Sequence, residues 1–217
     1  MSFIQSMNQL MRFLANPHFD GEFKKPSFLD LFLPLVSYFI LVIPIGVLLL
    51  ILSNILEFSM KTFNVSYYQR VFYGLVLGPF VEEIYFRLIY VFNKRNLSIV
   101  FCTSLILTIF FIVKAEPIKA YVFIAISLIY CLLLLSFARI SRIISTYFKI
   151  FFYCLAMVFA FLHLSNFSGV NSLEYLLAIF IIIPQFILGI ILGYLRLNYG
   201  FIYAVGFHMM VNISIVF

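Results

Sequence analysis

Long apolar runs separated by short polar stretches fill this chain from Phe28 onward. A helix that crosses a bilayer needs about 20 apolar residues, because each residue adds about 1.5 Å to its length. The runs are continuous, which argues against the polar–apolar alternation of a membrane barrel. The sequence therefore predicts seven transmembrane helices, near residues 29–56, 70–92, 97–114, 118–138, 147–167, 174–196 and 199–217.

The composition also indicates a membrane-embedded chain. Hydrophobic residues make up 65% of the sequence and the mean hydropathy is +1.16, whereas a soluble domain is about half apolar. We therefore predict an all-α, polytopic membrane protein in which residues 28–217 form one helical domain. Residues 1–27 carry apolar side chains at helical spacing, which predicts an amphipathic helix on the cytoplasmic membrane surface.

The basic residues are scattered singly or in pairs between the apolar runs. The net charge of +6 therefore reflects membrane topology, and we expect no nucleic-acid partner. With seven spans, nine Lys and Arg residues fall on the side of the N-terminus and four on the other side, leaving out Arg87. Because Lys and Arg are retained on the cytoplasmic side, this asymmetry predicts a cytoplasmic N-terminus.

Two adjacent carboxylates, Glu82 and Glu83, lie inside the second predicted span, while the other six acids fall in or beside predicted loops and helix ends. A charged side chain at the bilayer centre costs about 2.5–3.5 kcal/mol on insertion scales. Glu83 and Arg87 are four residues apart, so they share a helix face and can pair. Glu82 points elsewhere without a counter-ion, which makes it a candidate general base. Alternatively, all three residues form a structural ion network.

Two histidines lie in later apolar runs. His163 follows Phe159 by four residues, and His208 precedes Asn212 by four. His208 and Asn212 share a helix face, so their side chains can donate to one developing oxyanion. Each histidine could instead make a hydrogen bond that packs two helices together.

These groups together suit peptide hydrolysis. Glu82 can deprotonate a water that His163 helps to hold, and His208 and Asn212 can stabilise the tetrahedral intermediate. The sequence has no HExxH zinc motif, no GxSxG serine motif and no paired GxGD aspartates. No cofactor is favoured, but zinc is an alternative, because Glu82, His163 and His208 match a catalytic ligand count.

Three short motifs follow one another along the chain in the order EExxxR, FxxxH and HxxxN, beginning at Glu82, Phe159 and His208. This order resembles the CAAX protease and bacteriocin-processing family of intramembrane proteases, also called the Abi family. The resemblance implies an all-helical membrane endopeptidase in which Glu82 and His163 activate water without zinc. It also implies that His208 and Asn212 form the oxyanion hole.

The expected function is therefore an intramembrane endopeptidase of the CAAX or bacteriocin-processing type. Its expected partners are the bilayer and a peptide or membrane-protein substrate, which in this family can carry a lipid, and its expected location is a bacterial inner membrane. Two alternatives are a non-catalytic immunity or regulatory protein on the same scaffold, and a proton-coupled transporter, because buried Glu and His also form proton relays. Convergence of Glu82, His163, His208 and Asn212 on one site favours the enzyme.

The depth of the two halves of the site is a further expectation. If the fifth span is straight and starts near Tyr147 on the inner side, His163 lies nearer the outer face than Glu82 does. Only a steep tilt, or a shift of the span, would bring the two residues to one level.

Overall fold

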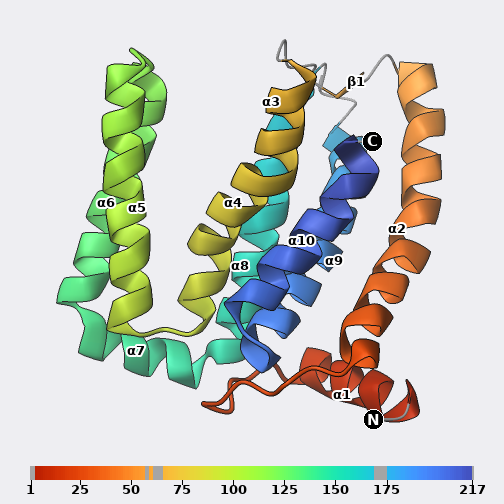
Figure 1. Ribbon diagram of the computed structural model, residues 1–217, viewed down its shortest axis with the longest axis horizontal. Helices are drawn as coiled ribbons and strands as arrows, with labels where there is room; N and C mark the ends of the chain where they lie inside the picture. The colour runs from red at the N-terminus through yellow and green to blue at the C-terminus, as the bar shows by residue number, and fades with distance from the viewer. Residues whose placement is uncertain (1–2, 57–58, 61–65, 169–174, 217) are drawn as a thin grey trace.

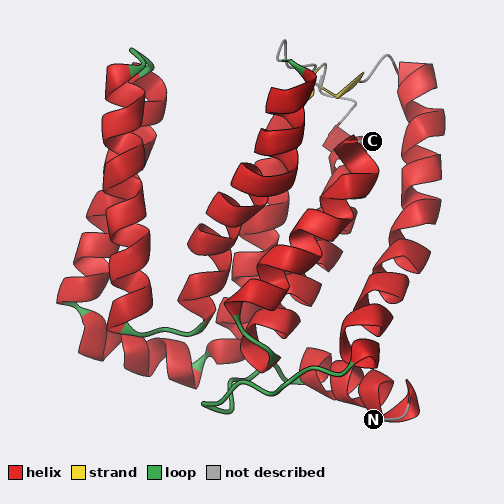
Figure 2. Ribbon diagram, viewed as in Figure 1, coloured by secondary structure: helices red, strands yellow, loops and turns green. Residues whose placement is uncertain are grey.

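The computed structural model describes residues 3–56, 59–60, 66–168 and 175–216. The regular secondary structure of the described residues is helical apart from one antiparallel pair of two-residue strands, and loops join the elements (Figure 2). In chain order the elements are α1 (Phe3–Ala15), α2 (Phe28–Leu56), β1 (Ser59–Met60), α3 (Tyr67–Val71), the π-helix η1 (Phe72–Leu77), α4 (Gly78–Arg87), the 3₁₀-helix η2 (Leu88–Tyr90), α5 (Lys94–Val113), α6 (Pro117–Leu135), α7 (Phe137–Thr146), α8 (Phe148–Leu162), the 3₁₀-helix η3 (His163–Asn166), β2 (Phe167–Ser168), α9 (Tyr175–Asn198) and α10 (Phe201–Val216).

The prediction of an all-helical, membrane-type chain is confirmed, but the count of seven spans is not. Among the described residues, α2, α5 and α6 are long and apolar enough to cross a membrane. The pair α7 and α8, which meet at 97°, adds a fourth if it is taken as one broken span. The predicted second span is divided into α3, η1, α4 and η2. Within α9 and α10, Ile182–Asn198 and Phe201–Ile213 are shorter apolar helices. Glu57, Lys61 and Glu174 lie outside the described residues.

Two amphipathic helices lie at the same end of the molecule, across the direction of the long helices (Figure 1). α1 buries Ser6, Leu10 and Phe13 against the bundle and exposes Met11. α7 exposes both of its arginines and turns by 97° into α8. Such helices place an apolar face in a membrane and a polar face in water, so this end of the fold has the character of a membrane surface.

The helix starts that frame the site have sequence-encoded caps. Ser66 and Gln69 form a capping box at the start of α3, each side chain bonding the other's backbone N–H. The Asn93 side chain accepts from the Asn96 N–H at 2.9 Å and starts α5. Short polar caps thus fix where the chain enters these two segments.

α9 packs closely on α8 through two glycines, as the GxxxG spacing of Gly189 and Gly193 predicts. A Cβ added at Gly193 would lie 2.6 Å from the Phe152 ring, and one added at Gly189 would lie 3.3 Å from the Ala156 carbonyl oxygen. The two backbones can therefore approach only because these positions lack side chains. This contact fixes the position of α8.

A π-helical turn precedes the acidic helix. The Gly78 N–H bonds the Tyr73 oxygen five residues back, and a Cβ at Gly78 would lie 2.7 Å from that oxygen. The next acceptor in this pattern is the Gly74 carbonyl, but Pro79 has no N–H to donate to it. Asn212 of α10 supplies the donor instead, with its Nδ2 2.9 Å from the Gly74 oxygen. Pro79 thus coincides with a π-turn that α10 holds by a side chain.

Candidate functional site

The structure brings residues from three helices to one point. Glu82 comes from α4, His163 is the first residue of η3 directly after α8, and His208 comes from α10. Glu82 Oε2 is 3.6 Å from His163 Nε2 and 3.8 Å from His208 Nε2. These three residues are separated by 81 and 45 positions in the sequence, so only the packing of the helices can bring them together.

The structure brings His163 and Glu82 to one level, with the two side chains 3.6 Å apart. The helix that leads to His163 starts at Phe148, close to the expected start near Tyr147, so a shifted span is not the reason. Instead, α3 and α4 run obliquely with respect to the α5–α6 pair (Figure 1). Tilt is thus the one of the two expected possibilities that brings the residues together.

Hydrogen bonding fixes the orientation of the His163 ring. His163 Nδ1 lies 2.8 Å from the Phe159 carbonyl oxygen, which can only accept, so Nδ1 carries the proton. In the neutral ring the lone pair of Nε2 then faces Glu82. The FxxxH spacing therefore has a direct structural meaning, since the residue four positions back orients the histidine.

Glu83 pairs with Arg87, as their spacing predicts. Glu83 Oε2 is 3.2 Å from Arg87 Nε, and both side chains are fully buried. The other oxygen of the same carboxylate, Oε1, is 3.0 Å from His208 Nδ1. Glu83 therefore joins α4 to α10 and accepts a hydrogen bond from His208 Nδ1. The other ring nitrogen of His208, Nε2, is then directed toward Glu82.

Phe159 supports both the cation and the histidines. Its ring centroid is 4.5 Å from Arg87 Cζ and 4.5 Å from the His163 ring centroid, and it makes an edge contact with His208. Arg87 Nη1 and Nη2 are buried without a hydrogen-bond partner among the described residues, so the ring face is the main neighbour of the guanidinium group beyond Glu83. The sequence motif identified Phe159, but gave no indication that it lies under Arg87.

Replacing Arg87 with alanine is expected to lower stability more than to change chemistry. The Glu83 carboxylate would stay buried without its cation, which costs about 3–5 kcal/mol when one partner of a buried pair is removed. Thermal unfolding of the detergent-solubilised protein should show a lower midpoint and a lower yield of folded protein. Arg70→Ala removes an exposed arginine from α3 and is the matched control, for which we expect no comparable loss. A normally stable but inactive Arg87→Ala protein would contradict a structural role.

Glu82 differs from Glu83 in its surroundings. Its side chain is 38% exposed, against 0% for Glu83, and its Oε2 atom is buried without a hydrogen-bond partner. Separations of 3.6 and 3.8 Å are too long for direct hydrogen bonds. A water about 2.8 Å from each atom can donate its two hydrogens to Glu82 Oε2 and His163 Nε2, and it accepts from His208 Nε2 when that ring is protonated. The geometry thus suits a bridging water held by a carboxylate and two imidazoles.

Asn212 lies one helical turn from His208, and its side chain makes a hydrogen bond with the backbone of η1. Its Nδ2 donates to the Gly74 oxygen, which uses one of the two amide N–H groups. The second N–H group is available to another acceptor. Asn212 therefore connects α10 to the turn that precedes Glu82, a role that the HxxxN motif did not indicate.

Arg196 is a further neighbour of the site. In the sequence it stood only as one of the nine Lys and Arg residues expected on the side of the N-terminus. Its Nε donates to the carbonyl oxygen of Arg87 at 3.0 Å, where α4 gives way to η2. This contact caps the end of the helix that carries the acids. The signal in the sequence was an arginine near the end of an apolar run, which by itself does not reveal a partner.

The three side chains of the site stand a few tenths of an ångström wider apart than the ligands of a tetrahedral zinc ion. Ligands 2.0–2.1 Å from a tetrahedral zinc ion lie about 3.3 Å apart, whereas Glu82 is 3.6 and 3.8 Å from the two histidines. Across the described residues, no three His, Cys, Asp or Glu residues form a group that could hold a metal ion. We therefore derive no step through a metal.

Metal removal is the direct measurement. We expect cleavage to survive exhaustive chelation, and metal analysis of the purified protein to find less than one zinc per chain. Stoichiometric zinc that is lost together with activity, with both restored by adding zinc back, would replace the glutamate mechanism with a metal one.

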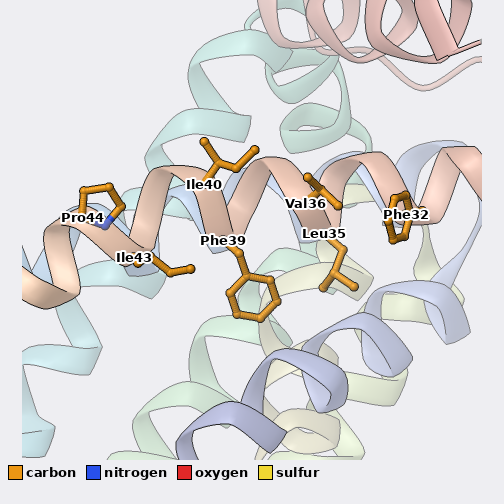
Figure 3. Close-up of a pocket in the computed structure, with 7 residues that line it drawn as sticks. All are labelled: Phe32, Leu35, Val36, Phe39, Ile40, Ile43 and Pro44. Carbon is orange, nitrogen blue, oxygen red and sulfur yellow. The ribbon is translucent and has the colours of Figure 1, made fainter.

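A hollow along α2 has a different character. It is lined by apolar side chains between Phe32 and Pro44 (Figure 3) and contains no titratable group. A lipid-facing helix surface is expected to look like this. Because all its lining residues come from α2, it lies apart from the carboxylate site.

Comparison with known proteins adds no name to this geometry. No protein-family model, curated protein or solved structure gives a significant match to the chain. The three motifs and the contacts among their residues therefore carry the functional assignment proposed below.

Proposed function

We propose that this protein is an intramembrane endopeptidase of the CAAX protease and bacteriocin-processing type. The observation that carries the proposal is the meeting of Glu82, His163 and His208 around one point, although they come from three separate motifs. If each histidine only packed two helices together, the same carboxylate oxygen would not need to face both rings. A site that activates water needs this arrangement.

In the proposed reaction Glu82 takes a proton from the water that it shares with His163. The hydroxide oxygen bonds to the carbonyl carbon of the scissile peptide, and the carbonyl oxygen becomes an oxyanion. Glu82 then gives the proton to the leaving nitrogen as the C–N bond breaks, which produces a carboxylic acid and an amine. Glu82 thereby returns to its starting charge.

His208 supplies the principal donor to the oxyanion. Its Nδ1 donates to Glu83, so a hydrogen on Nε2 makes the ring an imidazolium, which the Glu83 carboxylate stabilises. Nε2 can then donate where negative charge develops, and the second N–H of Asn212 is the proposed additional donor. Buried Arg87 and Phe159 hold this arrangement from behind.

The proposed setting is the inner membrane of a bacterium, with a cytoplasmic N-terminus and seven membrane-crossing helical segments. The apolar helices and the two amphipathic helices at one end support a membrane setting, and the orientation rests on the distribution of Lys and Arg along the sequence. The substrate is a peptide or a membrane protein, with or without a lipid chain. Glu82 is part-exposed, which allows a peptide bond to approach it.

The test is a cleavage assay in proteoliposomes. Purified protein is mixed with membrane-spanning and prenylated peptides, and mass spectrometry detects new peptide ends. Cleavage that depends on Glu82 supports the proposal. Absence of cleavage over the whole peptide set, together with proton flux detected by a pH-sensitive dye inside the vesicles, would favour the transporter alternative.

A further inference from the structure

Arg196 is a buried cation that no carboxylate neutralises among the described residues. It is 3% exposed, and its guanidinium group lies 5.1 Å from the Phe23 ring centroid. Its one side-chain hydrogen bond within the described chain runs from Nε to the Arg87 oxygen, so both Nη groups keep their donors. Within the described residues, lysine and arginine form ion pairs that do not include Arg196, namely Lys24–Asp20, Arg87–Glu83 and Lys119–Glu116. A buried charge with only neutral partners is costly unless a counter-ion is supplied.

More positive charge gathers at the same place. Lys94 and Arg95 occupy the first turn of α5. The Asn96 side chain of the same turn donates to the Leu88 oxygen at 3.0 Å, one residue after the Arg87 oxygen that Arg196 bonds, so the start of α5 lies beside Arg196. Cations in the first turn also oppose the helix dipole, whose positive end is at the N-terminus. Both residues are exposed, and Lys94 Nζ lies 5.7 Å from the Phe137 ring centroid of α7. The arrangement is unfavourable by itself and becomes favourable when an anion joins it.

The position of this cluster indicates the source of the anion. The start of α5 and the end of α9 lie at the end of the molecule that carries the amphipathic helices α1 and α7 (Figure 1). Those helices mark the level of lipid headgroups. Headgroup phosphates are therefore the anions nearest to Arg95 and Arg196. If this end is cytoplasmic, as proposed above, the leaflet around it is rich in anionic lipid.

We propose that a phosphate group, carried by an anionic phospholipid, binds between the N-terminus of α5 and Arg196. Guanidinium groups bind phosphate oxygens through paired N–H donors. Since the Asn93 cap takes the Asn96 N–H, the N-terminus of α5 adds its dipole and the backbone N–H groups that come before Asn96. Because Arg196 also bonds the end of α4, the bound lipid would hold together α4, α5 and α9. This inference goes beyond peptide hydrolysis and does not depend on it.

Lipid binding is measured on the full-length protein in nanodiscs. Thermal unfolding and lipid retention in native mass spectrometry are compared for phosphatidylglycerol and phosphatidylcholine. We expect phosphatidylglycerol to raise the unfolding midpoint and to stay bound. Arg95→Gln, which changes an exposed residue, should weaken retention by about tenfold or more, the effect of losing one charged hydrogen bond.

Arg139→Gln is the matched control, because it removes an exposed arginine from α7 at the same end of the molecule. General attraction to the membrane surface predicts a loss of about fivefold or less for either variant. Equal effects of the two substitutions, or no preference for phosphatidylglycerol, would overturn the proposal. Stabilisation by inorganic phosphate in phosphatidylcholine, with nothing added by phosphatidylglycerol, would keep the phosphate site and overturn the lipid as its source.

Discussion

Replacing Glu82 with glutamine is expected to abolish peptide hydrolysis and to leave the protein folded. The amide has nearly the same size as the carboxyl group but cannot accept a proton from water. A positioned general base contributes about 10²–10⁴-fold to the rate, so cleavage should fall to background. Folding should survive, because Glu82 is part-exposed and its Oε2 makes no hydrogen bond within the described chain.

The measurement is turnover of an identified peptide substrate in proteoliposomes, with thermal unfolding recorded on the same preparations. Glu22→Gln, which neutralises an exposed acid in the N-terminal loop, is the control and should retain full turnover. Glu83→Gln should instead lower the unfolding midpoint, because Glu83 contacts both Arg87 and His208. Wild-type cleavage by Glu82→Gln, or an unfolded Glu82→Gln beside a stable Glu83→Gln, would reverse the roles given to the two acids.

The different surroundings of the two acids were predictable because they depend on local helix geometry. Residues four apart share a helix face, so the Glu83–Arg87 pair follows from the sequence, and so does the separate direction of Glu82. The helical class follows in the same way from the length of the apolar runs. These are properties of short segments, which a sequence specifies directly.

The remaining features depend on how the segments pack. The contact between His208 and Glu83 joins residues 125 positions apart, and nothing in either motif specifies it. The number of spans was also uncertain from sequence, because an apolar run does not show whether its helix is broken, as at η1, or bent, as between α7 and α8. Prolines and glycines mark such points, but the π-turn at Gly74 needs its partner from α10 to be understood.

Replacing Asn212 with alanine is expected to reduce turnover by about 10²–10³-fold, the range for one lost oxyanion donor. A donor that acts only in the transition state lowers kcat and hardly changes substrate affinity. The same substitution also leaves the Gly74 oxygen without its donor, which costs stability by about 1–3 kcal/mol if that oxygen stays unsatisfied. A single substitution therefore changes two properties at once, and rate and stability must both be measured.

Pro79 provides a way to separate the two roles of Asn212. In Pro79→Ala, residue 79 regains an N–H that can bond the carbonyl five residues back, so Gly74 no longer depends on Asn212. The loss of unfolding free energy caused by Asn212→Ala should then be smaller in the Pro79→Ala protein than in the protein that keeps Pro79. The expected difference is about 1 kcal/mol, the net value of one hydrogen bond. If Asn212 also donates to the oxyanion, its removal should still lower kcat by about 10²–10³-fold in the Pro79→Ala protein. If the loss of kcat disappears together with the loss of stability, Asn212 only holds α10 against η1, and His208 alone carries the oxyanion.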